Sequence, residues 1–413
     1  MNVKNIIITF ASAVIFVILT VLPVNAVPSG REVDYSDGVD WRKFSGTSVN
    51  VYNWGEYIAI DDGEEDSFDV NGEFEKLTGI KVNYSNFASN EELYAKLKSG
   101  GSQYDIIIPS DYMASRLINE DMLEKLDFNN IPNFIYIDEK FKNPSYDPAN
   151  EYSVPYMSGI MGIVYNTELV DEEDDVGSWD IMWNAKYTKE MLMFLNSRDS
   201  FAIALLKLGY SVNTTSEKEL KEAAQLLKEQ KLLVQAYVMD EIYDKMGGGE
   251  AALAPYYAGD AVVMMNDNPS LAFSIPREGT NVFVDALCIP KNAPHKDAAE
   301  LYINFICETL VALKNCEYIG YATPHSAAYE LLDDEIKNNE IIYPPDEIIA
   351  NSQIYTALPP ETTKIIDSMW TEILSDVGTN PWLTPIMMLA AIGVTIYINI
   401  YKARKKKQKE VQL

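Results

Sequence analysis

The order of short segments between residues 49 and 109 restricts the fold more than any other feature of this sequence. Segments 49–53, 80–84 and 104–109 are short and rich in Val, Ile and Tyr, which is typical of strands. The segments between them, opening at Val70 and at the capping box of Ser89, have the pattern of helices. A strand–helix–strand–helix–strand order requires a parallel sheet with right-handed crossovers, so we predict an α/β fold.

Polar and aromatic residues follow each of these three predicted strands. Loops after successive parallel strands lie at one edge of the sheet, so we expect residues 53–57, 86–90 and 110–112 to meet in space. In the first loop, Gly55 allows a backbone turn that a side chain would obstruct. We therefore predict a ligand site at this edge.

The chain continues as α/β beyond a Gly-punctuated extended segment at 153–166. Its length predicts about two domains. Strands are predicted at 191–195, 233–238, 261–265 and 282–290, and helices at 201–208, 217–232, 298–305 and 310–316.

The first 46 residues are predicted to lie outside the fold. Residues 1–26 have the layout of a secretory signal peptide, with Lys4, an apolar run and small residues at 24–26. An uncleaved membrane anchor is the alternative. Residues 27–46 are polar and are predicted to form a linker, with the fold beginning near Thr47.

The C-terminal end predicts a membrane helix. Residues 382–401 contain no charged side chain and are long enough to cross a bilayer as a helix. The basic tail at 402–413 stays in the cytoplasm under the positive-inside rule, which places the preceding domain outside the cell. A buried core helix is the alternative. We predict an extracellular or periplasmic domain held at the cell membrane.

The charge and cysteine content restrict the class of partner. A net charge of −29 argues against nucleic acid and favours small cations, although secreted proteins are also acidic for solubility alone. Three cysteines are too few for a disulfide framework. Cys307 and Cys316 could pair, but we favour three small buried thiols, including Cys288.

No catalytic pattern stands out. The two histidines, His295 and His325, lie in predicted loops, and no Walker A or dinucleotide-binding motif is present. The acidic loop at 61–66 lacks the ligand spacing of a calcium loop. We predict a protein that is not an enzyme and that uses no cofactor or metal.

Aromatic and acidic residues occupy predicted loop positions instead. Aromatic faces attract ammonium groups by roughly 0.5–2 kcal/mol each, and a carboxylate bonded to a charged donor contributes about 1.5–3 kcal/mol. Together they predict a site for a long cation with an apolar middle, a polyamine; ordinary core packing is the alternative for any one aromatic. The residues are Trp54, Glu56, Tyr57, Tyr112, Asp199, Phe283, Asp285 and Tyr321.

Several segments resemble the extracytoplasmic spermidine/putrescine-binding proteins of polyamine ABC transporters. The resemblance spans about 49–371 and is most specific at 52–57, 77–82, 94–98, 104–110, 208–211 and 319–324. It implies a two-lobed clamshell of the periplasmic-binding-protein type, each lobe a mostly parallel sheet flanked by helices. It also implies a monomer that delivers its ligand to a permease and an ATPase on other chains. Lobe 1 is expected at 47–157 plus about 285–345, and lobe 2 at 158–284 plus about 346–376.

Carried over residue by residue, the resemblance implies nine ligand-binding positions. Asp285 and Asp199 match carboxylates that bind amines, with Asp285 the principal one, and both rank above Glu56. The other positions match aromatic walls, a hydroxyl and, at Gly55, a site where some members have Thr. They are Trp54, Gly55, Tyr57, Ser110, Tyr112, Phe283 and Tyr321.

Some positions depart from the family pattern. Asn196 stands where some members carry Asp, and residues 265–269 replace a stretch that usually contains a Trp. One wall is therefore missing or supplied by Tyr256 or Tyr257. A family Gln corresponds to Gln353 or Tyr355. The choice between putrescine, spermidine and a relative stays open.

Two other functions compete with polyamine capture. The same clamshell could bind another small solute; an anion would require a basic side chain, and Arg198 is the only candidate near the site. A membrane-tethered sensor is the second, but the short basic tail leaves no room for an output domain.

Overall fold

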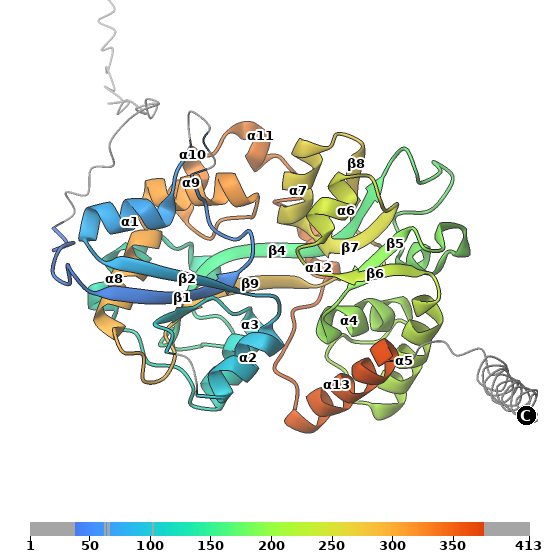
Figure 1. The fold of residues 1–413 in the computed structure, drawn as a ribbon, viewed down its shortest axis with the longest axis horizontal. Helices are drawn as coiled ribbons and strands as arrows, with labels where there is room; N and C mark the ends of the chain where they lie inside the picture. Colours follow the sequence, from blue (N-terminus) through green and yellow to red (C-terminus); the bar gives the residue numbers. More distant parts are fainter. Residues whose placement is uncertain (1–37, 62, 64–66, 101–102, 376–413) are drawn as a thin grey trace, which may run out of the picture.

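The computed structural model describes residues 38–375, except 62, 64–66 and 101–102. Two lobes lie side by side and are joined by the long strands β4 (Ser153–Asn166) and β9 (Val282–Cys288) (Figure 1). The predicted signal peptide at 1–26, the membrane helix at 382–401 and the tail at 402–413 lie outside the described residues. No helix within the described residues is long and apolar enough to cross a membrane.

Lobe 1 begins with the predicted parallel unit, which is confirmed. Strand β1 pairs in parallel with β2 on one side and with β3 on the other. Gly79 ends the first helix in the left-handed conformation, and the Ser89 side chain accepts from the Glu92 N–H to open the second. The elements are β1 (Ser48–Trp54), α1 (Val70–Thr78), β2 (Lys81–Phe87), α2 (Asn90–Lys98), β3 (Ile106–Ile107) and α3 (Asp111–Asn119).

The sheet as a whole is mixed, which corrects the expectation of mostly parallel sheets. Strand β9 pairs antiparallel with both β3 and β4, and β4 pairs antiparallel with β7 and β8. These connecting strands run back along the sheet, so the order is β2-β1-β3-β9-β4-β7-β5-β6, with β8 on β4. The pattern at 49–109 could not reveal strands that return from the other lobe.

Lobe 2 contains a second parallel group, in which β5 pairs with β6 and β7. The strand predicted at 261–265 is wrong, because these residues lie in helix α7, where Ala261 and Met264 face the core at helical spacing. The preceding strand was missed because Pro255 argues against a strand. The elements are β5 (Met191–Phe194), α4 (Ser197–Lys207), α5 (Glu217–Lys231), β6 (Val234–Val238), α6 (Ile242–Gly247), β7 (Leu253–Tyr257), α7 (Ala258–Asp267) and β8 (Leu271–Ser274).

The last part of the chain visits both lobes. Helices α8 (Lys296–Ile306), α9 (Thr309–Ile319), α10 (Ser326–Leu331) and α11 (Asp334–Lys337) belong to lobe 1. After α12 (Asp346–Asn351), helix α13 (Pro360–Ser375) packs on α4 and α5 of lobe 2. Short 3-10 helices lie at Phe128–Asn130, Pro132–Tyr136, Glu139–Phe141, Trp179–Trp183 and Ala185–Tyr187. The residue boundaries expected for the two lobes stay predictions.

Each lobe has its own apolar core. Trp41 and the three cysteines are among the buried residues. The fold begins inside the predicted linker, because Trp41 is buried in lobe 1 and packs edge-on against Phe305. Residues 27–46 are mostly polar, but burial of the large Trp41 ring fixes this part of the chain to lobe 1. The favoured reading of the cysteines is confirmed, since Cys288, Cys307 and Cys316 are buried free thiols.

Candidate functional site

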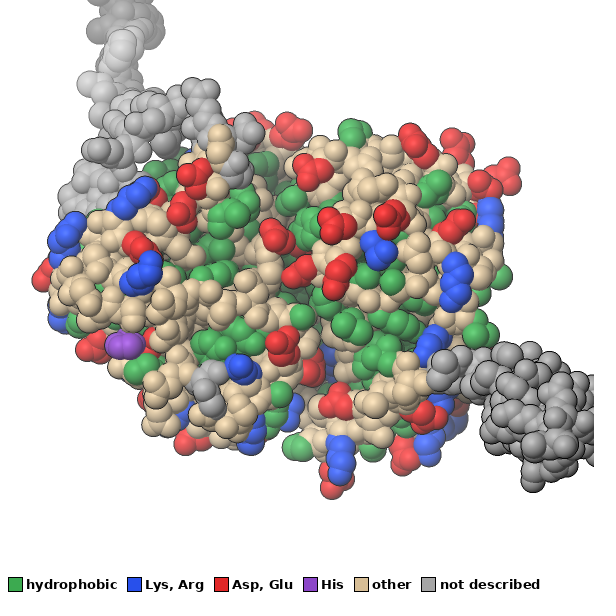
Figure 2. Space-filling model, viewed as in Figure 1, with side chains coloured by type: hydrophobic (Ala, Val, Ile, Leu, Met, Phe, Trp, Pro, Cys, Tyr) green, Lys and Arg blue, Asp and Glu red, His purple; other side chains and the backbone are tan. Residues whose placement is uncertain are grey.

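A cleft between the two lobes holds about 670 Å³ of space, part of it open to solvent. Acidic side chains lie on both lobes beside the groove that separates them (Figure 2). All nine residues expected from the sequence line this cleft: Trp54, Gly55, Tyr57, Ser110, Tyr112, Asp199, Phe283, Asp285 and Tyr321. Their role in ligand binding stays a prediction.

The loops that were expected to meet do so on the lobe 1 side. Trp54 ends β1, Asn90 opens α2 and Ser110 precedes α3, and all three line the cleft. The Trp54 indole N–H donates to the Ile108 carbonyl at 2.9 Å, and the Asn90 amide donates to the Ser110 hydroxyl at 3.1 Å. The edge of the parallel sheet therefore presents a fixed wall.

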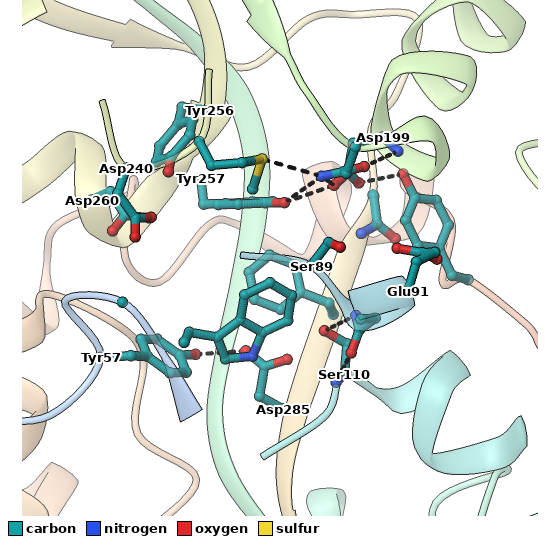
Figure 3. Close-up of a pocket in the computed structure, with 18 of the residues that line it drawn as sticks. Tyr57, Ser89, Glu91, Ser110, Asp199, Asp240, Tyr256, Tyr257, Asp260 and Asp285 are labelled. Carbon is teal, nitrogen blue, oxygen red and sulfur yellow. Dashed lines mark hydrogen bonds between the residues drawn. The ribbon is translucent and has the colours of Figure 1, made fainter. Parts of the chain in front are cut away.

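Asp285 lies on the connecting strand β9, at the floor of the cleft (Figure 3). Its side chain is 4% exposed, and its Oδ2 accepts a hydrogen bond from the Tyr57 hydroxyl at 2.7 Å. Its Oδ1 is buried and accepts no bond of normal geometry from the described residues. Burial raises the pKa of Asp285 to about 6, although hydroxyls of Ser110 and Tyr57 oppose the shift. A ligand could therefore supply the hydrogen-bond donor that Oδ1 of Asp285 lacks among the described residues.

Asp199 is surrounded by donors from its own lobe and the segment that follows α12. Its carboxylate accepts bonds from the Tyr257 hydroxyl at 2.6 Å, the Asn196 amide at 2.7 Å and the Tyr355 hydroxyl at 2.8 Å. Both tyrosines line the cleft. Asp199 thus holds two aromatic walls in position.

Asp260, on α7, connects the lobes. It accepts bonds from Tyr243 of lobe 2 at 2.6 Å and from Tyr321, which packs in the lobe 1 core. Burial raises the pKa of Asp260 to about 6, and the nearby Asp240 carboxylate adds to the shift. The cleft therefore carries a second buried carboxylate with a raised pKa.

Aromatic rings enclose these carboxylates from both lobes. Tyr57 contacts Tyr321 at 5.0 Å between ring centroids, and Tyr257 contacts Phe283 at 5.5 Å. Such faces attract an ammonium group and also cover hydrocarbon. None of the lining side chains in the described part of the chain belongs to Lys or Arg. The chemistry of the cleft suits a cation with an apolar segment.

The structure shows where the residues lie between which the sequence left a choice. Tyr256 and Tyr257 both line the cleft, whereas Asn266 lies at the end of α7 outside it. Tyr355 lines the cleft, whereas the Gln353 side chain accepts bonds from Ser211 and Val212. Tyrosines of the cleft are therefore in place to supply the wall that the departure at 265–269 puts in doubt, and that role stays a prediction.

Two charged residues near the site lie outside its lining. Glu56 forms part of the turn after β1, with a left-handed φ of 45°. The Arg198 guanidinium lies behind the wall, 4.5 Å from the Tyr355 ring centroid and hydrogen-bonded to Asn213. Arg198 is therefore not among the described residues that line the cleft.

Sequence reasoning missed several lining residues. Asp240 follows the correctly predicted strand at 233–238, so the rule about strand ends could have found it. Asp260 was hidden because its helix was taken for a strand. Met239, Asn281 and Glu91 gave no signal of their own.

A family model for bacterial extracellular solute-binding proteins matches residues 72–344. The chain belongs to this family. A spermidine/putrescine-binding periplasmic protein of Salmonella typhimurium is 37% identical to this solute-binding protein over 307 residues, covering 74% of this chain and 86% of the relative. The resemblance predicted from the sequence is confirmed.

Solved structures agree with this assignment. A structure from Listeria monocytogenes, assigned as a spermidine/putrescine ABC transporter protein, is similar to this solute-binding protein with a TM-score of 0.75 and 35% identity. The match covers 79% of this chain and 99% of that chain. The spermidine/putrescine ABC transporter substrate-binding protein PotD of Streptococcus pneumoniae gives a TM-score of 0.65 at 34% identity, covering 79% and 98%. The periplasmic-binding-protein-like α/β fold is thereby confirmed.

Proposed function

We propose that this protein is the substrate-binding component of an ABC importer and captures a polyamine, spermidine or putrescine, outside the cytoplasm. The observation that carries the proposal is the buried Oδ1 of Asp285, which accepts no hydrogen bond of normal geometry from the described residues and lies in a cleft walled by aromatic rings. An ammonium group supplies both the donor and the compensating charge. The proposed role of the protein is in transport, and we assign no catalytic step to the cleft.

Ligand capture and lobe closure are coupled in this proposal. The ammonium of the polyamine binds Asp285, while Trp54, Tyr57, Tyr112, Phe283 and Tyr321 cover its hydrocarbon. These side chains come from lobe 1 and from the connecting strand β9, and Tyr257 and Tyr355 of lobe 2 face them across the cleft. A ligand that contacts both lobes favours the closed state by its extra affinity for that state. The closed protein then presents its ligand to a permease, which an ATPase on another chain drives.

We further propose that residues 382–401 tether the protein to the cell membrane, with the basic tail at 402–413 in the cytoplasm. The absence of charge in the first segment and the Lys and Arg content of the second support this orientation. The ligand-binding domain then lies on the side from which an importer takes its substrate. The predicted signal peptide at 1–26 directs the same topology.

Isothermal titration calorimetry of the full-length protein in detergent tests the polyamine proposal. We expect saturable binding of at least one of putrescine, cadaverine, spermidine and spermine, with one site per chain. Glutamate and citrate serve as anionic controls and should give no heat. A folded protein that binds none of the four amines would contradict the proposed substrate class.

The two buried aspartates predict a specific pH dependence. Asp285 and Asp260 have pKa values of about 6 in the folded protein, above the value of roughly 3.9 of an unfolded chain. From pH 8 to 5, the folded state therefore takes up protons that the unfolded state does not, which stabilises the ligand-free protein. Polyamine binding requires the ionised carboxylates, so affinity should fall below pH 6.

Melting temperatures with and without putrescine at pH 8 and pH 5.5 measure both effects. We expect the ligand-induced increase in melting temperature to shrink at the lower pH, while the amines themselves stay protonated. A ligand-induced increase of equal size at the two pH values would contradict a role for carboxylates that titrate near pH 6.

A further inference from the structure

Asp240 reaches across the mouth of the cleft from lobe 2 to lobe 1. Asp240 lies between β6 and α6. It is exposed to solvent, and its side chain lines the cleft. A Cβ atom added to Gly55 of lobe 1 would lie 2.1 Å from its Oδ2 and 2.9 Å from its Cγ. The carboxylate therefore occupies the space that a side chain at position 55 would fill.

The carboxylates of the cleft differ in how many protein donors they already accept. Asp199 accepts three side-chain hydrogen bonds and Asp260 accepts two, whereas Asp285 and Glu91 accept one each. The Asp240 carboxylate accepts none from the described residues, although its neighbour Asp260 is buried beside it (Figure 3). A carboxylate has about four acceptor positions, so among the lining carboxylates of the described chain Asp240 retains the largest capacity for a ligand ammonium.

The charges near Asp240 also lack compensation. Glu56 of lobe 1 and Glu241 of lobe 2 repel its negative form, and no ion pair with Asp240 is formed within the described residues. A group of acidic side chains alone does not define a site. Here the same cleft also contains the buried, unpartnered Oδ1 of Asp285, which marks it as the place where a cation binds.

We propose that Asp240 is a specificity-determining residue that binds the second ammonium group of the ligand while Asp285 binds the first. Gly55 is required because its missing side chain lets this carboxylate approach lobe 1. Asp199 holds the walls formed by Tyr257 and Tyr355. This assignment rests on the proposed polyamine function and adds that the ligand needs two cationic centres, one at the floor of the cleft and one at its mouth.

A double-mutant cycle between Gly55 and Asp240 tests the assignment. In the full-length protein, Asp240→Asn should weaken putrescine binding by about 10-fold, the range expected for losing one charge-assisted hydrogen bond. Gly55→Ala should weaken it in the same direction, because the added methyl group displaces the Asp240 carboxylate. In an Asp240→Ala background, Gly55→Ala should change the dissociation constant less than about 2-fold, since no carboxylate remains to be displaced.

Asp244→Asn is the matched control, because Asp244 is an exposed aspartate of α6 that does not line the cleft. It removes the same charge from the same lobe and should alter affinity less than about 2-fold. Equal losses for Asp244→Asn and Asp240→Asn, or equal effects of Gly55→Ala in both backgrounds, would overturn the assignment. Absence of putrescine binding by the unsubstituted protein would instead overturn the proposed function. Circular dichroism melts confirm that each variant is folded.

Discussion

Asp285→Asn is expected to weaken polyamine binding by about 100-fold and to leave the ligand-free protein at least as stable as before. The buried carboxylate is the principal partner of an ammonium group, and a bond between two charged groups in a dry site contributes about 1.5–3 kcal/mol. Without ligand, the same charge is costly, because burial raises its pKa to about 6. Asparagine keeps the shape and removes this cost at pH 7. Calorimetry and thermal melting measure the two effects.

The opposite signs of these effects distinguish a binding residue from a structural one. Asp111 provides the matched control, since it is also buried, burial raises its pKa to about 8, and it does not line the cleft. Asp111→Asn should leave putrescine affinity within about 3-fold. Unchanged affinity in Asp285→Asn, or a loss of stability without a loss of affinity, would show that Asp285 serves the fold and not the ligand.

Trp54→Ala is expected to weaken polyamine binding by about 10- to 100-fold. The indole lies at the end of β1. It is held by its hydrogen bond to the Ile108 carbonyl and by packing on the Phe87 ring, with 4.6 Å between the ring centroids. Alanine removes a cation–π face of roughly 0.5–2 kcal/mol and the apolar surface that covers the hydrocarbon of the ligand. Because the ring is only partly buried, the fold should survive the change.

Trp54→Phe is the graded control, because it keeps an aromatic face but loses the indole N–H and part of the area. Its affinity should lie between those of the unsubstituted protein and the alanine variant. The measurement is again the putrescine dissociation constant, with melting temperature as a check on folding. Wild-type affinity in Trp54→Ala would show that this ring is a scaffold residue, even if the cleft binds polyamines.

The site was predictable from the sequence where it depends on local order along the chain. The strand ends at Trp54, Asn90 and Ser110 meet because parallel β-α-β units place them at one edge, whatever the rest of the protein does. Asp285 was singled out as an acidic residue at a predicted loop position, and the family resemblance made it the principal carboxylate; the structure places it on strand β9. Its lack of a donor is a property of three-dimensional packing.

The proposed roles of Asp240 and Asp260, unlike their positions, depend on contacts between lobes. Asp240 and Gly55 are distant in sequence, and only the folded protein shows that one fills the space left by the other. Asp260 receives one hydroxyl from each lobe, which no pattern along the chain encodes. The mixed order of the sheet was missed for a similar reason. Strand β9 pairs with β3 of lobe 1, although most of the lobe 2 sequence lies between these two strands.

The position of Asp285 on a connecting strand has a kinetic consequence. It pairs with Met157 beside the irregularity in β4, on the strands about which the two lobes would turn. A group on the axis of rotation keeps nearly the same surroundings in the open and closed forms, so it holds an ammonium in both and favours neither. A side chain far from the axis, such as Asp240 at the mouth of the cleft, meets the ligand only after rotation. Substitution of Asp285, on the axis, should therefore change the association rate of the ligand. Substitution of Asp240, at the mouth of the cleft, should change its dissociation rate.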